Sequence, residues 1–153
     1  MKKIFTVQYR RAREAKTDYD LRLKLLKSGK ERLVVRKSDR NLLAQVVQYT
    51  PTGDKITSSA SSRDLVKLGW KGSRKSIPAG YLVGLLIGKK AKGKNVIVDL
   101  GFQVSNKGSK LYAIVQGAIE GGAKVECDKS MFPDPKRYAG EEFLTIKKKI
   151  GAQ

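Results

Sequence analysis

The spacing of apolar residues changes partway along this chain, and the change constrains its fold more than any other feature. Residues 32–37, 42–49 and 55–60 are short segments, the first two rich in Val and Leu, and they are joined by short connections, one of them the turn-forming run 50–54. Such lengths are typical of strands in hairpins. After residue 77 the apolar residues recur at i, i+3 and i+4, as on a helix with one buried stripe. The chain therefore predicts an antiparallel meander followed by helices.

Helix patterns stand before and after these strand patterns. A first helix is predicted to begin after Thr17 as its cap, and a short helix is predicted to begin at Ser62. A long helix is predicted after Ser76, with Pro78 at an early position where its missing N–H costs nothing. Residues 96–98 are apolar throughout, as in a buried parallel strand. A helix over 111–119 and a last strand over 124–127 follow. The order predicts a three-layer α/β fold with a mixed five-stranded sheet, an antiparallel meander followed by parallel βαβ crossings, as in ribonuclease H-like folds.

Further expectations concern the ends of the chain and a row of glycines. Gly80, Gly84 and Gly88 lie beside the apolar stripe of the long helix and would let that helix approach the sheet closely. Residues 133–135 open a final helical turn, and the lysines at 147–149 suggest a frayed basic tail. We expect an extended basic arm over 1–16, one α/β domain over 17–128 and a C-terminal extension over 129–153 that packs on the domain or on RNA.

The charge is unevenly distributed. The first forty residues contain 14 Lys or Arg and five acids, which gives +9 of the chain's net +19, whereas residues 111–153 carry only +1. Such a field steers polyanions and supplies most of the salt-dependent free energy of nucleic-acid binding. Nucleic acid is therefore the predicted partner.

Catalysis and cofactors are not expected. With no His and a single Cys127, the chain lacks the ligands of an ordinary Zn, Fe or Cu site and the general base of a serine hydrolase. Metal-dependent phosphodiester cleavage needs several carboxylates at strand ends, and only Asp99 is so placed. Residues 88–94 match G-x-x-x-x-G-K, but the order is helix then strand, the reverse of a phosphate-binding loop.

Membrane and DNA are not expected as partners either. The longest apolar stretch, 77–87, is about half the length of a membrane span, and no predicted helix pairs a long apolar face with a basic one. The basic residues concentrate on an arm and a hairpin, not on a recognition helix. These patterns favour a soluble intracellular protein.

The candidate RNA-contacting residues mix cations with flat or short polar side chains, which can stack on unpaired bases and bind phosphate. Trp70 lies between glycines, and its pattern fits RNA stacking and core packing equally. The candidates are Tyr9, Arg10, Arg11, Arg13, Lys16, Tyr19, Arg22, Lys24, Arg36, Lys37, Ser38, Arg40, Asn41, Trp70, Lys71, Lys107 and Lys110.

Several of these residues stand in motifs that resemble one family, the archaeal and eukaryotic form of ribosomal large-subunit protein L-eighteen. The similarity runs from Tyr9 to about Glu142. Its most specific pieces are Tyr9-Arg10-Arg11 with Glu14 and residues 16–19; residues 32–38 with Ala44-Gln45; residues 68–72; Pro78-Ala79 with Tyr81-Leu82 and residues 84–86; and Asp99, Gly101 and Gly108-Ser109. Asp39 and Gln103 depart from the family pattern, which usually has Asn and often His there.

The resemblance implies a non-catalytic ribonuclease H-like fold and a place in the ribosome. It implies a cytoplasmic protein of the central protuberance that contacts 5S rRNA, 23S rRNA and neighbouring large-subunit proteins. It also implies that the arm, the start of the first helix and the first hairpin form the 5S rRNA surface. The alternative is a non-ribosomal RNA-binding module or assembly factor on the same scaffold.

Overall fold

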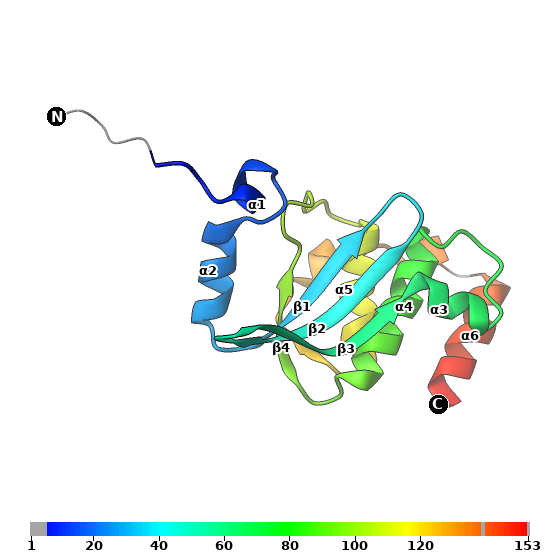
Figure 1. The fold of residues 1–153 in the computed structure, drawn as a ribbon. Coiled ribbons are helices and arrows are strands. Elements are labelled where there is room, and N and C mark those ends of the chain that lie inside the picture. The colour runs from blue at the N-terminus through cyan, green and yellow to red at the C-terminus, as the bar shows by residue number, and fades with distance from the viewer. Residues whose placement is uncertain (1–5, 139, 153) are drawn as a thin grey trace.

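A five-stranded mixed sheet organises the chain. The structure, a computed structural model, describes residues 6–138 and 140–152. Its strands are β1 (Glu31–Lys37), β2 (Leu42–Thr50), β3 (Gly53–Ser61), β4 (Asn95–Asp99) and β5 (Lys124–Val125), arranged in the order β3-β2-β1-β4-β5 (Figure 1). The strand β1 therefore lies in the middle, between one strand of the meander and one parallel strand.

The pairings confirm the predicted meander and the mixed sheet. β1 pairs antiparallel with β2, and β2 pairs antiparallel with β3 with a bulge at Val46/Val47. β4 joins β1 in parallel, as the apolar run 96–98 predicts, and β5 joins β4 in parallel. β5 ends at Val125, two residues earlier than predicted.

Helices α4 (Ile77–Lys90) and α5 (Lys110–Glu120) pack together behind the sheet, and α3 (Ser62–Lys67) precedes them (Figure 1). The predicted start of α4 is confirmed, because the hydroxyl oxygen of Ser76 accepts the Ala79 N–H at 3.3 Å and Pro78 lies in the first turn. The core between these helices and the sheet includes Leu33, Leu82 and Ile114, each at most 1% exposed.

Gly84 and Gly88 of α4 face α5 and not the sheet, so their predicted role was wrong, whereas Gly80 lies near both α5 and Leu42 of β2. A Cβ at Gly84 would lie 2.1 Å from the Ile114 carbonyl oxygen, and one at Gly88 would lie 2.3 Å from that of Ala118. On α5, Gly117 is equally close to the backbone of Tyr81. Glycines on both helices thus let the two backbones touch.

The described part of the arm is partly helical. Arg10–Arg13 form one turn, α1, where the sequence suggested an extended segment. Its backbone is held locally, since the Lys16 and Thr17 N–H groups both donate to the Arg11 carbonyl. Residues 1–5 of the predicted arm lie outside the described residues. The next helix, α2 (Tyr19–Lys27), is capped by Asp18 and not by Thr17, because Asp18 Oδ1 accepts the Leu21 N–H at 2.9 Å.

The lysine-rich end of the chain is a packed helix and not the frayed tail predicted. Two 3-10 turns, η1 (Lys129–Met131) and η2 (Pro135–Tyr138), lead to α6 (Glu141–Ala152), which buries Phe143, Ile146 and Ile150. Lys89 Nζ donates to the carbonyls of Ile150 and Gly151 at the C-terminal end of α6. Apolar residues at i, i+3 and i+7 pack this helix against α4. Lys148 is exposed, whereas Lys147 pairs with Glu120 at 2.6 Å and Lys149 donates to the Leu68 carbonyl at 3.2 Å.

Candidate nucleic-acid interface

The face of the sheet opposite α4 and α5 carries polar and charged side chains. Successive side chains of a strand point to opposite faces. On β1, Leu33 and Val35 are buried in the core, so Arg32, Val34 and Arg36 lie on the other face. This face is the one on which the arm and α2 are placed, and we call it the open face.

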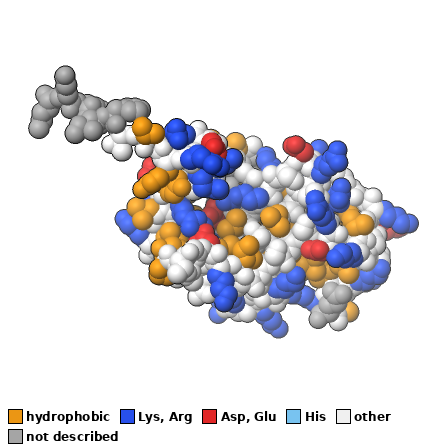
Figure 2. Space-filling view, in the orientation of Figure 1, with side chains coloured by type: hydrophobic (Ala, Val, Ile, Leu, Met, Phe, Trp, Pro, Cys, Tyr) orange, Lys and Arg blue, Asp and Glu red, His pale blue; other side chains and the backbone are white. Residues whose placement is uncertain are grey.

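Helices α1 and α2 flank the open face and complete a hollow of about 300 Å³. Figure 2 shows Lys and Arg side chains around this region, with acidic side chains between them. Five cationic and three acidic residues take part in the lining. The residues that line it are Arg11, Lys16, Thr17, Asp18, Leu21, Arg22, Arg32, Val34, Arg36, Gln45, Val47, Asp54, Ile56, Asp99 and Gly101.

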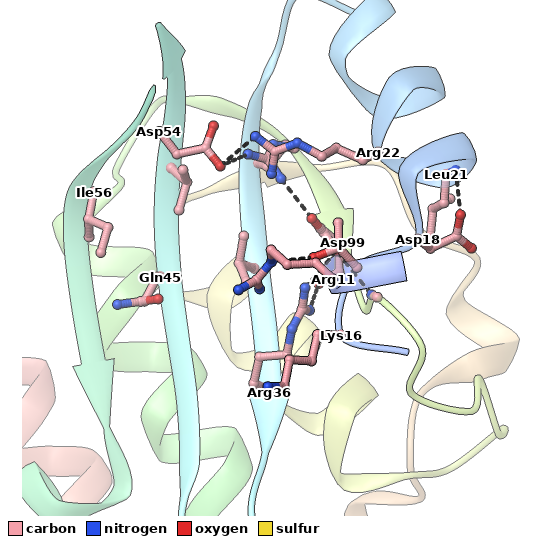
Figure 3. A pocket seen from close by; sticks show the side chains of 15 residues that line it. Arg11, Lys16, Asp18, Leu21, Arg22, Arg36, Gln45, Asp54, Ile56 and Asp99 are labelled. Carbon is pink, nitrogen blue, oxygen red and sulfur yellow. Dashed lines mark hydrogen bonds and ion pairs between the residues drawn. The ribbon is translucent and has the colours of Figure 1, made fainter. Parts of the chain in front are cut away.

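A chain of ion pairs crosses the hollow from α2 to β4 (Figure 3). Asp54 Oδ2 accepts from Arg22 at 2.9 Å and from Arg32 at 2.7 Å. Arg32 also donates to Asp99 Oδ2 at 2.9 Å. Asp99 Oδ1 then accepts from Arg36 at 3.0 Å and from the Gly101 N–H at 3.0 Å. The order Arg22–Asp54–Arg32–Asp99–Arg36 alternates in sign, and we call it the charge ladder.

Burial makes the middle of the charge ladder energetically important. Arg32 is 3% exposed and Asp99 6% exposed. Removing one partner of such a pair leaves an uncompensated buried charge, which costs about 3–5 kcal/mol. Arg32 Nε is buried and has no hydrogen-bond partner among the described residues. The ladder thus fixes its arginines tightly, and their positions are preorganised.

The arginines also perturb Asp54, the acid between Arg22 and Arg32 in the charge ladder. Partial burial favours the neutral form of Asp54, but hydrogen bonds and charge from Arg32 and then Arg22 outweigh it, so the pKa of Asp54 lies below its ordinary value. Asp54 therefore remains ionised at neutral and mildly acidic pH.

An aromatic patch lies beside the hollow. The rings of Tyr9 and Tyr19 are 5.5 Å apart between centroids and tilted by 49°. Phe102, from the loop after β4, borders the same depression and is 54% exposed, and Val7 is 61% exposed. Exposed aromatic faces next to arginines are typical of surfaces that stack unpaired bases.

The predicted arm and helix residues lie on this side of the molecule. Arg10, Arg11 and Arg13 are exposed on α1, and Lys24 is exposed on α2. Arg10 pairs with Glu14 at 3.2 Å, and Lys16 pairs with the same carboxylate at 2.7 Å.

The first hairpin differs in one respect from the prediction. Lys37, Ser38 and Arg40 are exposed, and Ser38 Oγ accepts the Asn41 N–H at 3.0 Å, which closes the turn. Arg36, one of the candidates on this hairpin, is not part of the exposed turn, because it lies within β1 and its Nη1 donates to the Asp99 carbonyl at 2.6 Å. Strand alternation and the carboxylate on β4 turn its side chain onto the open face.

Trp70 packs in the core, so its assignment as an RNA-stacking residue is corrected. It is 7% exposed, and its Nε1 donates to the Ser73 carbonyl at 3.4 Å. A Cβ at Gly72 would lie 2.8 Å from its ring, so the flanking glycine lies against the indole. Lys71 beside it is exposed.

Two other candidates, Lys107 and Lys110, come from the connection between β4 and α5. Lys107 is exposed, and Lys110 is half-buried at the first residue of α5. Neither lysine lines the depression at the aromatic patch, and Phe102 is the one residue of this connection that does.

Several residues of the open face were not among the sequence candidates. Strand alternation was the available signal for Arg32, because Arg32, Val34 and Arg36 are spaced by two along β1 and share one face. Gln45 carried the same signal, because it stands between the core residues Ala44 and Val46 on β2. No local pattern indicates the other three, which come from different strands and loops. The residues that were missed are Arg32, Gln45, Asp54, Asp99 and Phe102.

Among the described residues, no group of three or more His, Cys, Asp or Glu side chains is placed to hold a metal ion. No helix in the described ranges is both long and apolar enough to span a bilayer.

A mixed α/β sheet with a basic and aromatic face is typical of proteins that bind nucleic acid. A family model described as "Ribosomal large subunit proteins 60S L5, and 50S L18" matches residues 3–95, which is more than half of the chain, and the chain belongs to this family. The match includes α1, α2, the meander, α3 and α4, and so it includes most of the hollow. The family resemblance inferred from the sequence motifs is thereby confirmed.

Proposed function

We propose that this large-subunit ribosomal protein binds 5S rRNA through α1, α2, the first hairpin and the open face, and helps attach that RNA to 23S rRNA. The observation that carries the proposal is the convergence of these elements on one side of the molecule. The hollow on this side is lined by five cationic residues, and the Tyr9–Tyr19 pair lies beside it.

The chemistry of this face suits RNA. Arginine guanidinium groups bind phosphate bidentately and stack on bases, and tyrosine rings stack on unpaired bases. The charge ladder holds its arginines in place before RNA arrives, which lowers the entropy lost on binding. The uneven charge of the chain, +9 within the first forty residues, supplies long-range attraction.

The rest of the proposal follows the family. We expect a non-catalytic protein in the central protuberance of the cytoplasmic ribosome, in contact with 23S rRNA and neighbouring large-subunit proteins. The strand order and the helices packed behind the sheet support the ribonuclease H-like topology. The division at residues 16/17 and 128/129 stays a prediction, although Tyr138, Phe143 and Ile150 belong to the main core.

The experiment compares the affinity for 5S rRNA with the affinity for an equal mass of transfer RNA at two salt concentrations. We expect preferential binding of 5S rRNA. If about six to ten phosphates are neutralised, log affinity should fall by roughly 0.7–0.9 per phosphate for each decade of salt. Equal affinity for both RNAs, or a slope near one or two, would contradict the proposal.

Sedimentation distinguishes a ribosomal constituent from the alternative, a non-ribosomal RNA-binding module. A ribosomal constituent sediments with the large subunit at moderate salt and is stoichiometric with it. A module or assembly factor would be largely free or substoichiometric.

A further inference from the structure

We propose that the hollow on the open face receives one unpaired nucleotide of the bound RNA, with its base in the depth of the hollow and its phosphate at the rim. This inference rests on the proposed function and names the nucleic-acid unit that the hollow takes. A volume of about 300 Å³ is at the lower end of small-molecule pockets, which suits a single nucleotide and excludes a duplex.

The floor of the hollow is suited to a base. Val34, Val47 and Ile56 come from three adjacent strands and give an apolar surface. Gln45 lies on β2, where it is paired with Val34 of β1 and Ser59 of β3 (Figure 3). Its amide makes no hydrogen bond to any other described residue, so one donor group and one acceptor remain for a base edge.

The rim offers a cation for phosphate. Arg11 donates through Nε to Thr17 Oγ1 at 2.9 Å, and its two terminal nitrogens have no partner among the described residues. The other arginines of the lining are held by the carboxylates of the charge ladder, and Lys16 is paired with Glu14. Arg11 is therefore the cation best placed to take a phosphate.

The acids in the lining argue against a free anion as the occupant. Asp54 and Asp99 lie within the hollow and would repel a bare phosphate placed there. A nucleotide avoids that cost, because its neutral base occupies the depth while its charge stays at the edge. Sequence-specific recognition of RNA mostly uses such splayed, unpaired bases.

The test is a double-mutant cycle between the protein and the RNA. Gln45→Leu removes the amide at similar volume, and Gln48→Leu, on the same strand but exposed and outside the hollow, is the matched control. Each variant of the full chain is titrated with 5S rRNA and with 5S rRNAs that carry one abasic site at each unpaired position. Thermal unfolding checks that both variants are folded.

We expect Gln45→Leu to weaken binding about tenfold with an unchanged salt slope, since no charge is altered, and Gln48→Leu to bind like the wild type. An abasic site at one position should lower the affinity of the wild-type protein about tenfold. The same abasic site should not lower the affinity of Gln45→Leu any further, because the effects of coupled partners are not additive. Wild-type affinity of Gln45→Leu, or no coupled position, would overturn the proposal. Failure of the wild-type protein itself to prefer 5S rRNA would instead reject the proposed function.

Discussion

The contact between α4 and α5 gives the sharpest test of the packing. Gly84→Ala would place a Cβ 2.1 Å from the Ile114 carbonyl oxygen and 3.0 Å from the Ala118 nitrogen. Ordinary contact needs about 3.5 Å, so the two backbones must separate by more than about 1 Å. Since these atoms belong to the backbone of α5, no side-chain rotation relieves the overlap.

The magnitude follows from two opposing effects. Alanine is better than glycine in a helix by about 1 kcal/mol. Overpacking typically costs about 1–3 kcal/mol and more when the neighbours are rigid. At the upper end of that cost, the net loss is about 2 kcal/mol in the free energy of unfolding, which lowers Tm by about 4–8 °C for a chain of this size.

The assay is urea and thermal unfolding followed by circular dichroism. The control is Gly151→Ala in α6, where a new Cβ meets nothing within 4 Å. That variant should be as stable as the wild type or slightly more stable. Stability of Gly84→Ala equal to or above that of the wild type would refute the claim that the backbones of α4 and α5 touch at Gly84.

Three further outcomes are expected. Arg40→Ala, at the exposed hairpin tip, should weaken 5S rRNA binding by about 1–3 kcal/mol without loss of stability. Arg36→Ala should weaken binding and also lower Tm, because Asp99 loses a partner. Equal Tm values for the two variants would refute the stabilising role of the charge ladder. Deleting residues 2–16 should lower 5S rRNA affinity at least tenfold, about 1.4 kcal/mol. Tm should change little, since α1 buries no residue. If the truncated protein is unfolded, the arm has a structural role instead. Burial, and then the charge of Asp128, raise the pKa of the Cys127 thiol. Alkylation of Cys127 should therefore be slow at neutral pH and accelerate as the pH rises above the ordinary thiol pKa. Rapid alkylation at pH 7 would contradict the raised pKa.

Local patterns predicted the elements better than their partners. Ser76 and Pro78 marked the start of α4 because capping is a property of adjacent residues. The glycine row indicated a close approach, but a row of glycines does not identify the element that approaches, and the partner proved to be α5. The lysines near the end of the chain obscured the helical spacing of Phe143, Ile146 and Ile150.

The candidate site was predicted in part for the same reason. Exposed cations of α1 and the hairpin are visible in the sequence as charge. The charge ladder is not, since Asp54 and Asp99 are far apart in the chain and meet Arg32 only after the sheet forms. Trp70 fits both a stacking and a packing role in sequence, and only its surroundings decide for the core.

The central claim is that RNA binds on the side of the molecule formed by α1, α2 and the open face. It is tested most directly by two charge-matched double variants. Arg13→Ala with Lys24→Ala removes two exposed charges on this side, and Lys67→Ala with Lys148→Ala removes two exposed charges on α3 and α6. With 5S rRNA at fixed salt, the first should lose at least tenfold in affinity and the second should stay within about threefold. Equal losses in the two variants would contradict the account.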